Sequence, residues 1–309
     1  MHAVQQRVGK PVFGRSCSWE EAHIVLIAVP WEGGVSFRRG TAQAPSLIRT
    51  VSPQIDYYRP EATALENAPI FWVEPEAPFS VEGSADETYK QKVLPYVQGW
   101  AQAALEAGKA FGVVGGDHSV PLGAHLALQT LLPEADYGLL HIDAHADLRS
   151  AYEGLTYSHA TILYHLSKLP HIERLVAVGV RDWAREEAEY AQQLYPRLAI
   201  YEMRRLAHAA YLGRSWMETI SEIVSLLPSH VYVSLDVDAL EVGYVPHTGT
   251  PVPGGFHYEQ LFFLLEMIQR SGRKLIAFDV CETGGDELDA IVSAHLLYRL
   301  CGLLLPDGR

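Results

Sequence analysis

The sequence is poor in cysteine, short of positive charge and free of long uncharged hydrophobic runs. Only Cys17, Cys281 and Cys301 are present, an odd number without framework spacing, which favours a reduced, cytoplasmic setting. The 24 Lys and Arg against 37 Asp and Glu give a net charge of −13, which disfavours nucleic acid and anionic membranes as partners. The first apolar stretch, residues 24–29, follows two glutamates and is too short for a secretory core or a membrane span. A soluble protein that binds cations is expected.

Short apolar runs alternate with longer helical patterns along almost all of the 309 residues. Strands are expected at residues 24–29, 110–114, 137–142, 175–180, 199–201, 231–235 and 275–280. Helices are expected at residues 87–106, 122–132, 216–227, 259–270 and 289–303. Several strands are continuously apolar, which is typical of strands covered on both faces. The alternation therefore predicts an α/β fold with a mainly parallel sheet and helices on both sides.

No linker, repeat or low-complexity block divides the chain, so residues 1–309 are expected to form a single domain. Residues 67–84, rich in Pro and Glu, are expected to form a surface excursion. Residues 242–255 hold three prolines and four glycines, and this pattern indicates a long ordered loop. Loops of that length in compact α/β folds are usually functional.

Acidic and histidine residues follow the expected strands at the ends where parallel sheets bind ligands. The residues are His118, then Asp143, His145 and Asp147, then Asp236 and Asp238, and finally Asp279 and Glu282. Residues two apart in an extended segment point to the same side, so these side chains can converge. A lone Asp-x-Asp is usually a solvated strand end or a helix cap. Several clusters at one sheet edge instead favour a site for two divalent cations, because buried carboxylates need compensation. Without Asp279 and Glu282, the set has four carboxylates and two imidazoles, which suit Mn(II) better than structural zinc.

Three motifs together resemble the ureohydrolase family, that of arginase and agmatinase: Gly115-Gly-Asp-His-Ser119, His141-Ile-Asp-Ala-His-Ala-Asp147 and Ser234-Leu-Asp-Val-Asp238. Tyr157-Ser-His-Ala-Thr161 and Thr248-Gly-Thr-Pro251 add to the resemblance. It implies a three-layer α/β/α arginase-like fold and two Mn(II) ions, with Ni or Co as alternatives. One ion would be held by His118, Asp143, Asp147 and Asp236, and the other by His145, Asp143, Asp236 and Asp238. A metal-bridging hydroxide would then attack a guanidinium carbon.

The resemblance also implies roles for three further side chains. Asp147 would move a proton to the leaving nitrogen, and His159 would shuttle protons to solvent. Glu282 would bind the guanidinium group of the substrate. Two of them also have a structural interpretation, since His159 could cap a helix and Glu282 could pair with a nearby arginine. Asp117 could orient a metal-binding imidazole or stabilise its own turn.

In arginases, two stretches bind the amino-acid end of arginine. The corresponding residues here, 148–150 and 182–184, lack the expected polar residues, and their absence disfavours arginine as the substrate. The run from Asp147 to Ala160 resembles the agmatinase branch, so the expected reaction converts agmatine to putrescine and urea. Glu241-Val242 and Thr283-Gly284-Gly285 depart from the usual family residues. Guanidinobutyrate, guanidinopropionate, guanidine and formimidoylglutamate therefore stay open as substrates. A substrate with a carboxylate tail would require a free cation, and Arg149 and Arg181 are the candidates, although Arg181 could instead pair with Asp182. Cys281, next to Glu282, is expected to be buried as a small apolar residue.

Two other classes of protein stay open. One is a deacetylase-like amide hydrolase with a single zinc, which a metal content of two ions per chain would exclude. The other is a non-catalytic regulatory or assembly subunit, which the intact set of metal ligands disfavours. Family members commonly assemble as trimers or hexamers, so the resemblance implies a homotrimer or homohexamer.

Overall fold

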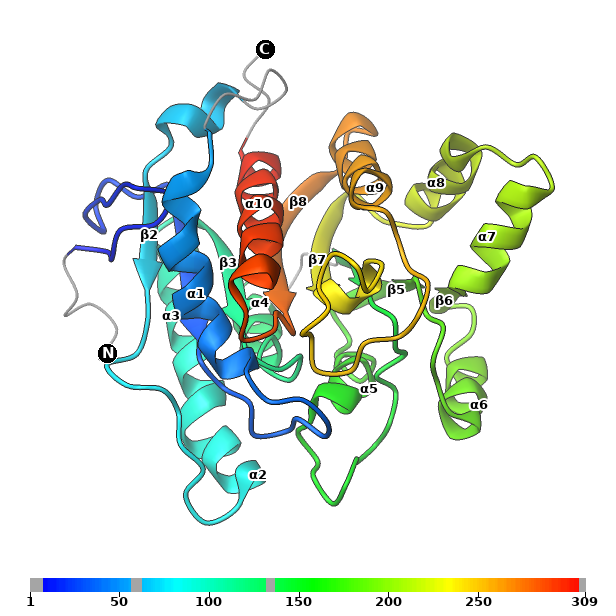
Figure 1. Ribbon diagram of the computed structural model, residues 1–309, viewed down its shortest axis with the longest axis horizontal. Helices are drawn as coiled ribbons and strands as arrows, with labels where there is room; N and C mark the ends of the chain where they lie inside the picture. The colour runs from blue at the N-terminus through cyan, green and yellow to red at the C-terminus, as the bar shows by residue number, and fades with distance from the viewer. Residues whose placement is uncertain (1–7, 57–62, 132–136, 306–309) are drawn as a thin grey trace.

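A computed structural model describes residues 8–56, 63–131 and 137–305 of the chain. Its centre is one eight-stranded sheet in the order β2-β1-β3-β8-β7-β4-β5-β6, in which every pair of neighbours is parallel (Figure 1). The strands are β1 (Ile24–Val29), β2 (Ile70–Val73), β3 (Ala110–Gly115), β4 (Tyr137–Ile142), β5 (Ile172–Val178), β6 (Leu198–Tyr201), β7 (His230–Asp236) and β8 (Lys274–Cys281). The mainly parallel sheet expected from the sequence is confirmed.

Helices cover both faces of this sheet. They are α1 (Ala44–Val51), α2 (Ala85–Thr88), α3 (Leu94–Glu106), α4 (Leu122–Leu131), α5 (Ile162–Leu166), α6 (Arg185–Gln193), α7 (Met203–Tyr211), α8 (Trp216–Ser225), α9 (Tyr258–Arg270) and α10 (Glu287–Leu304). In the view of Figure 1, α1, α9 and α10 lie in front of the sheet, whereas α3 and α4 lie behind it. The result is the expected three-layer α/β/α arrangement.

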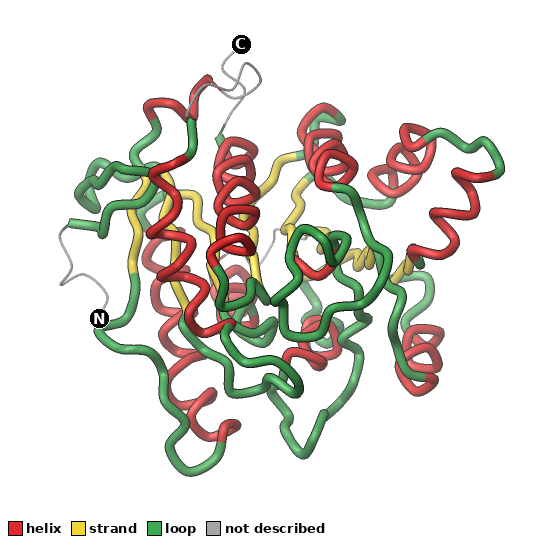
Figure 2. Tube along the Cα trace, viewed as in Figure 1, coloured by secondary structure: helices red, strands yellow, loops and turns green. Residues whose placement is uncertain are grey.

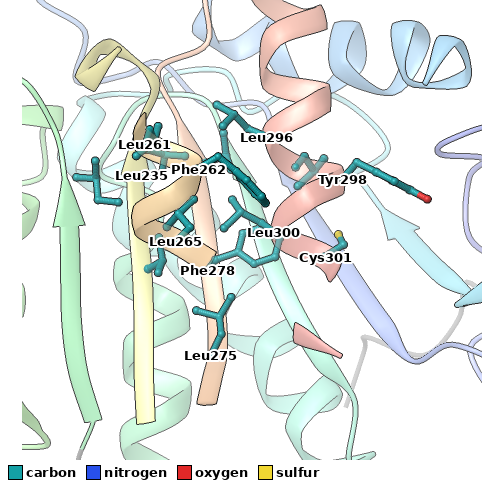
Figure 3. Close-up of a cluster of buried hydrophobic side chains, with 14 of the residues drawn as sticks. Leu235, Leu261, Phe262, Leu265, Leu275, Phe278, Leu296, Tyr298, Leu300 and Cys301 are labelled. Atoms are coloured by element: carbon teal, nitrogen blue, oxygen red, sulfur yellow. The ribbon is translucent and has the colours of Figure 1, made fainter. Parts of the chain in front are cut away.

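Alternating side chains of the strands fill two separate cores. Leu26, Leu140 and Phe278 belong to the core under α1, α9 and α10, where α9 and α10 place leucine and phenylalanine side chains on the sheet (Figure 3). Val25, Leu139 and Ala277, their neighbours in sequence, belong to the core under α3, α4 and α5. This period of two is the physical reason why the strands are apolar along their whole length.

All seven strands expected from the sequence are present, but one strand was missed. Strand β2 lies inside residues 67–84, so the expectation of a surface excursion there is wrong for its first part. All four β2 residues are buried, yet the run is short and is flanked by Pro69 and by Glu74-Pro75, whose composition is that of a loop. Helices α1, α5, α6 and α7 were also missed. Leu132, the last residue of one expected helix, lies outside the described residues.

The sheet order places the chemically important strands side by side. Strands β3, β8, β7 and β4 are consecutive neighbours, so their carboxyl ends form one short edge. The loops that leave these strands gather below the sheet in Figure 2. Residues 242–255 form one of these loops and contain no helix or strand, as expected. None of the helices in the described ranges combines the length and apolar character of a membrane span.

Candidate active site

The expected metal ligands lie together at the carboxyl ends of β3, β7 and β4, which share one edge of the sheet with β8. His118 follows β3, Asp143, His145 and Asp147 follow β4, and Asp236 ends β7 with Asp238 just beyond it. Five of these six side chains are buried, and His145 is the partly exposed one. The structure thus brings together all six residues that the sequence proposed, from three segments that lie between positions 118 and 238. Their role as metal ligands stays a prediction.

His118 is the centre of one group of carboxylates. Its Nδ1 atom lies 3.0 Å from Asp143 Oδ2, and 3.4 Å from the Oδ2 atoms of both Asp147 and Asp236. The other ring nitrogen, Nε2, lies 2.9 Å from the Ser234 hydroxyl. Ser234 in turn donates a hydrogen bond to Asp279 Oδ1 at 3.1 Å. Ser234 and the buried Asp279 therefore hold the His118 ring at Nε2, while Nδ1 lies among the carboxylates.

A second group surrounds His145. Its Nδ1 atom lies 3.1 Å from Asp238 Oδ2 and 3.5 Å from Asp143 Oδ1. Asp143 thus contacts His118 with one oxygen and His145 with the other. This is the position expected of a carboxylate shared between two ions. Two overlapping sets that could hold a metal ion, His118-His141-Asp143-Asp147 and Asp143-His145-Asp238, share this residue.

The charges of this array are not balanced by its own residues. Burial, together with Asp238 and Asp143, raises the pKa of Asp236 well above its usual range. Burial and the Asp143 carboxylate raise the pKa of Asp147 to about 7. Although burial alone would lower the pKa of His118, the carboxylates around it raise that pKa well above its usual range. Asp238 Oδ2 is buried and accepts no aligned hydrogen bond from a described atom, although His145 Nδ1 lies 3.1 Å away. Divalent cations fit this array because they would compensate the crowded carboxylates.

A cavity of about 360 Å³ opens beside the array. His145, Asp147 and His159 line it, together with aromatic side chains of Phe37, Tyr152 and Trp183. His159 Nε2 lies 3.2 Å from the Ser36 hydroxyl, a contact that no sequence motif predicted. Burial, and then the nearby His145, lower the pKa of His159 to about 4, so a neutral imidazole faces the cavity. The helix cap at this point is Ser158, whose hydroxyl accepts from Ala160 N–H, and not His159.

Glu282 is placed by its backbone and by one hydrogen bond. Its φ of 64° lies in the left-handed region, and Thr248 Oγ1 donates to its carbonyl at 2.8 Å. The Oε1 atom accepts the His118 backbone N–H at 2.9 Å, while Oε2 is buried without a hydrogen-bond partner in the described structure. No arginine pairs with Glu282 among the described residues. One carboxylate oxygen thus remains available beside the proposed metal ligands.

Three other expectations are now decided by contacts. Asp117 accepts hydrogen bonds from the backbone N–H groups of Gly34 and Ser119, so it stabilises its turn rather than a metal-binding imidazole. Arg181 does not pair with Asp182, because its guanidinium donates to loop carbonyls including those of Asp238 and Val252. Cys281 is fully buried, as expected for a small apolar residue.

The sequence assigned no role to His141 or Ser234 at this site, and it placed Asp279 among the acids at the strand ends without a role of its own. All three are fully buried on β4, β7 and β8. The available signal was the presence of polar residues within otherwise apolar strands, two or three positions before a predicted ligand. Residues two apart in a strand point to the same side, and this holds for His141 with Asp143 and for Ser234 with Asp236. Asp279 lies three positions before Glu282, so the rule does not apply to that pair.

The fold and the site define a three-layer α/β/α protein with a carboxylate and imidazole centre suited to divalent ions. The family model described as the arginase family matches residues 22–301. The chain is 34% identical over 296 residues to the N(1)-aminopropylagmatine ureohydrolase of Thermus thermophilus, covering 94% of each. It is 29% identical over 277 residues to an agmatinase of Bacillus anthracis, covering 89% of this chain and 88% of that one. This protein belongs to the arginase family and is a hydrolase of that family.

Solved structures agree with this assignment. The agmatine ureohydrolase of Thermoplasma volcanium superposes with a TM-score of 0.75 at 25% identity, covering 93% of this chain and 92% of that one. The proclavaminate amidino hydrolase of Streptomyces clavuligerus superposes with a TM-score of 0.77 at 24% identity, covering 92% of each, and supports the fold alone. The arginase-like fold expected from the sequence is confirmed.

Proposed function

We propose that this protein hydrolyses the guanidinium group of agmatine to give putrescine and urea, with two Mn(II) ions per chain. The observation that carries the proposal is the array around Asp143, which contacts both His118 and His145 while Glu282 hydrogen-bonds to the backbone of His118. The names of the relatives from Thermus thermophilus and Bacillus anthracis support a substrate of the agmatine type.

His118, Asp143, Asp147 and Asp236 would hold one ion, and His145, Asp143, Asp236 and Asp238 would hold the other. Oxygen ligands dominate both sets, which suits Mn(II) and accommodates Ni or Co. Bound ions of this kind supply Lewis acidity, which ionises a water molecule near neutral pH. A single-zinc deacetylase-like site would use a smaller set of ligands, so two ions per chain distinguish the two classes.

The residues of this chain would position the substrate and move its protons. Glu282 Oε2, which lacks a partner in the described structure, would accept guanidinium N–H groups. Asp147 would deliver a proton to the leaving nitrogen, because it lines the cavity in which the substrate would lie. His159 faces the cavity beside the Ser36 hydroxyl and would pass protons toward solvent.

The tail of the substrate is proposed to be cationic. Arg149 lines the cavity but is paired with Glu186 at 2.7 Å, and Arg181 is occupied by loop carbonyls. Neither arginine of the described site is therefore free for a carboxylate tail. Asp182 and Trp183 also line the cavity, and an acidic residue and an aromatic ring favour an amine. N(1)-aminopropylagmatine is the second candidate, because a relative of that name aligns over 94% of the chain.

The test is urea release from a panel of compounds with each of Mn, Ni and Co. We expect urea from agmatine or N(1)-aminopropylagmatine, and none from the variants Asp143→Asn or Glu282→Gln. Glu189→Gln, an exposed residue of α6, is the control with the same change of charge. Turnover of guanidinobutyrate, guanidinopropionate, guanidine or formimidoylglutamate without turnover of the amines would contradict the proposed substrate. Partner binding by an intact protein that hydrolyses nothing would instead support the non-catalytic class.

A cytoplasmic location is proposed because the three cysteines are free, and assembly as a homotrimer or homohexamer is proposed on the family resemblance. Light scattering on the purified protein would measure the mass of the particle. A particle of 34.3 kDa, the mass of one chain, would contradict the proposed assembly.

A further inference from the structure

We propose that His141 is a positioning residue that orients the shared carboxylate Asp143 and braces the ring of His118. The inference rests on the proposed metal centre, but not on the identity of the substrate. His141 lies near the end of β4, between Ala177 of β5 and Ser234 of β7, and is fully buried. No role for it follows from the proposed ligand sets or from the proposed reaction.

The first observation is the contact with Asp143. The Nε2 atom of His141 lies 3.2 Å from Asp143 Oδ2, the same oxygen that lies 3.0 Å from His118 Nδ1. Neither ring nitrogen of His141 makes an aligned hydrogen bond to a described atom. Since buried polar groups in proteins are rarely left without a partner, the nearby carboxylate is the group that Nε2–H can serve. A donor at this position restricts the rotation of the carboxylate that both ions would share.

The second observation is the packing of two imidazole rings. The rings of His141 and His118 stack with their centroids 5.1 Å apart and their planes 13° apart. Ser234 contacts the opposite edge of the His118 ring through Nε2 at 2.9 Å. His118 is therefore held on one face by His141 and at one edge by Ser234. His141 thus touches two side chains that would bind the same ion.

A positioning role for His141 can be distinguished from a role as a metal ligand. His141 can be grouped geometrically with His118, Asp143 and Asp147, so direct coordination is the competing interpretation. However, His141 lies on the strand two residues before Asp143, with its Nε2 3.2 Å from an oxygen of that proposed ligand. A positioning residue changes the affinity for the ion without changing the number of nitrogen ligands.

The experiment compares metal affinity for three substitutions of His141 in the full chain. His141→Phe keeps a ring that can stack but removes the donor. His141→Gln places an amide nitrogen near the position of Nε2, whereas His141→Asn places it near Nδ1. Mn(II) affinity is measured by competition with a chelator, and the visible spectrum of the Co(II)-loaded protein reports the ligand set. The matched control is His125→Phe, since His125 is also fully buried but hydrogen-bonds to Tyr137.

We expect His141→Phe to weaken Mn(II) binding by about 10- to 100-fold. His141→Gln should recover most of that loss, His141→Asn should not, and His125→Phe should bind Mn(II) as the unmodified protein does. The Co(II) spectrum should keep its form in His141→Phe once the protein is saturated. If His141→Phe does not fold, which its thermal unfolding would show, the contrast between Gln and Asn carries the test.

Three results would overturn the inference. One is an unchanged Mn(II) affinity in His141→Phe, and another is equal behaviour of the Gln and Asn variants. The third is loss of one ion with an altered Co(II) spectrum, which would make His141 a ligand. Metal binding is measured without substrate. A protein that hydrolyses no guanidino compound but shows the expected affinities would therefore refute the proposed function and leave this inference standing.

Discussion

Glu282 and Asp147 both adopt left-handed backbone conformations, with φ values of 64° and 51°. Side chains other than glycine rarely adopt this region, and residues held there cluster at functional sites. Each is fixed by a hydrogen bond to its own carbonyl, from Thr248 Oγ1 in one case and from Tyr164 N–H in the other. The left-handed backbone thus directs the carboxylates of Glu282 and Asp147 toward the proposed metal centre. A regular strand or turn would direct them elsewhere.

Gly249 provides the space into which Glu282 extends. A Cβ atom at position 249 would lie 2.8 Å from Glu282 Oε2, closer than real contacts allow. We expect Gly249→Ala to turn the carboxylate aside and to lower kcat/KM for agmatine at least about tenfold, or ~1.4 kcal/mol. Metal content and thermal unfolding should stay unchanged, because the displaced atom ends a side chain.

The matched control for this prediction is Gly243→Ala in the same loop, where a Cβ would meet nothing within 4 Å. Steady-state kinetics and metal analysis of both variants check it. Equal kcat/KM in Gly249→Ala and the unmodified protein would show that Glu282 Oε2 does not contact the substrate.

At the scale of elements, the loop that carries His159 is tied to α2. The carboxylate of Asp86 in α2 accepts the backbone N–H groups of Thr156 and Tyr157 at 3.0 to 3.1 Å. Those residues come directly before Ser158, which caps the short helix that begins with His159. One side chain of α2 therefore determines where the loop lies at the edge of the cavity.

Asp86 should make stability depend on pH. Burial alone would raise its pKa, but the N–H donors of Tyr157 and Thr156 lower it below the ordinary value of 3.8. A lowered carboxyl pKa stabilises the folded state above the unfolded value, and the contribution is lost as pH falls through the folded pKa. We expect Asp86→Asn to lower the free energy of unfolding by about 1–3 kcal/mol at pH 7.

The difference between Asp86→Asn and the unmodified protein should stay constant down to about pH 5 and narrow below it. Urea unfolding at several pH values measures this difference. Glu106→Gln, at the exposed end of α3, is the control for the loss of one charge. A difference that widens toward acidic pH would contradict the assigned sign.

At the scale of the whole molecule, the site exists because of the order of the strands. Strands β3, β8, β7 and β4 come from four separate parts of the chain, yet they lie next to one another. Their carboxyl ends thereby bring Asp143, Asp147, Asp236 and Asp238 into one buried cluster of like charge. Such a cluster lowers the stability of the fold unless cations neutralise it.

Removal of metal should therefore destabilise the folded protein. An ion that binds only the folded state at 100 times its dissociation constant adds about 2.7 kcal/mol. We expect Mn(II) to raise Tm and a chelator to lower it, as measured by calorimetry. In Asp236→Asn the gain from Mn(II) should be much smaller, while the metal-free protein should be more stable because one crowded carboxylate is gone. Equal gains in both proteins would place the stabilising ion elsewhere.

The sequence by itself determined the composition of the layers and the candidate residues. The apolar runs at 24–29 and 137–142 have the same bounds as β1 and β4, because a strand that is buried on both faces has an almost continuously apolar sequence. Motifs carried over from the family resemblance named His118, Asp143 and Glu282 without any knowledge of distances.

The tertiary structure decided what depends on contacts between distant segments. It showed that Arg149 and Arg181 are already paired, that Asp117 serves its turn, and that His141 touches two proposed ligands. It also placed β2 at the edge of the sheet, where pairing with β1 outweighs a composition typical of loops. Local patterns report which face of a segment is buried, but the partners on that face are fixed only when the whole chain packs.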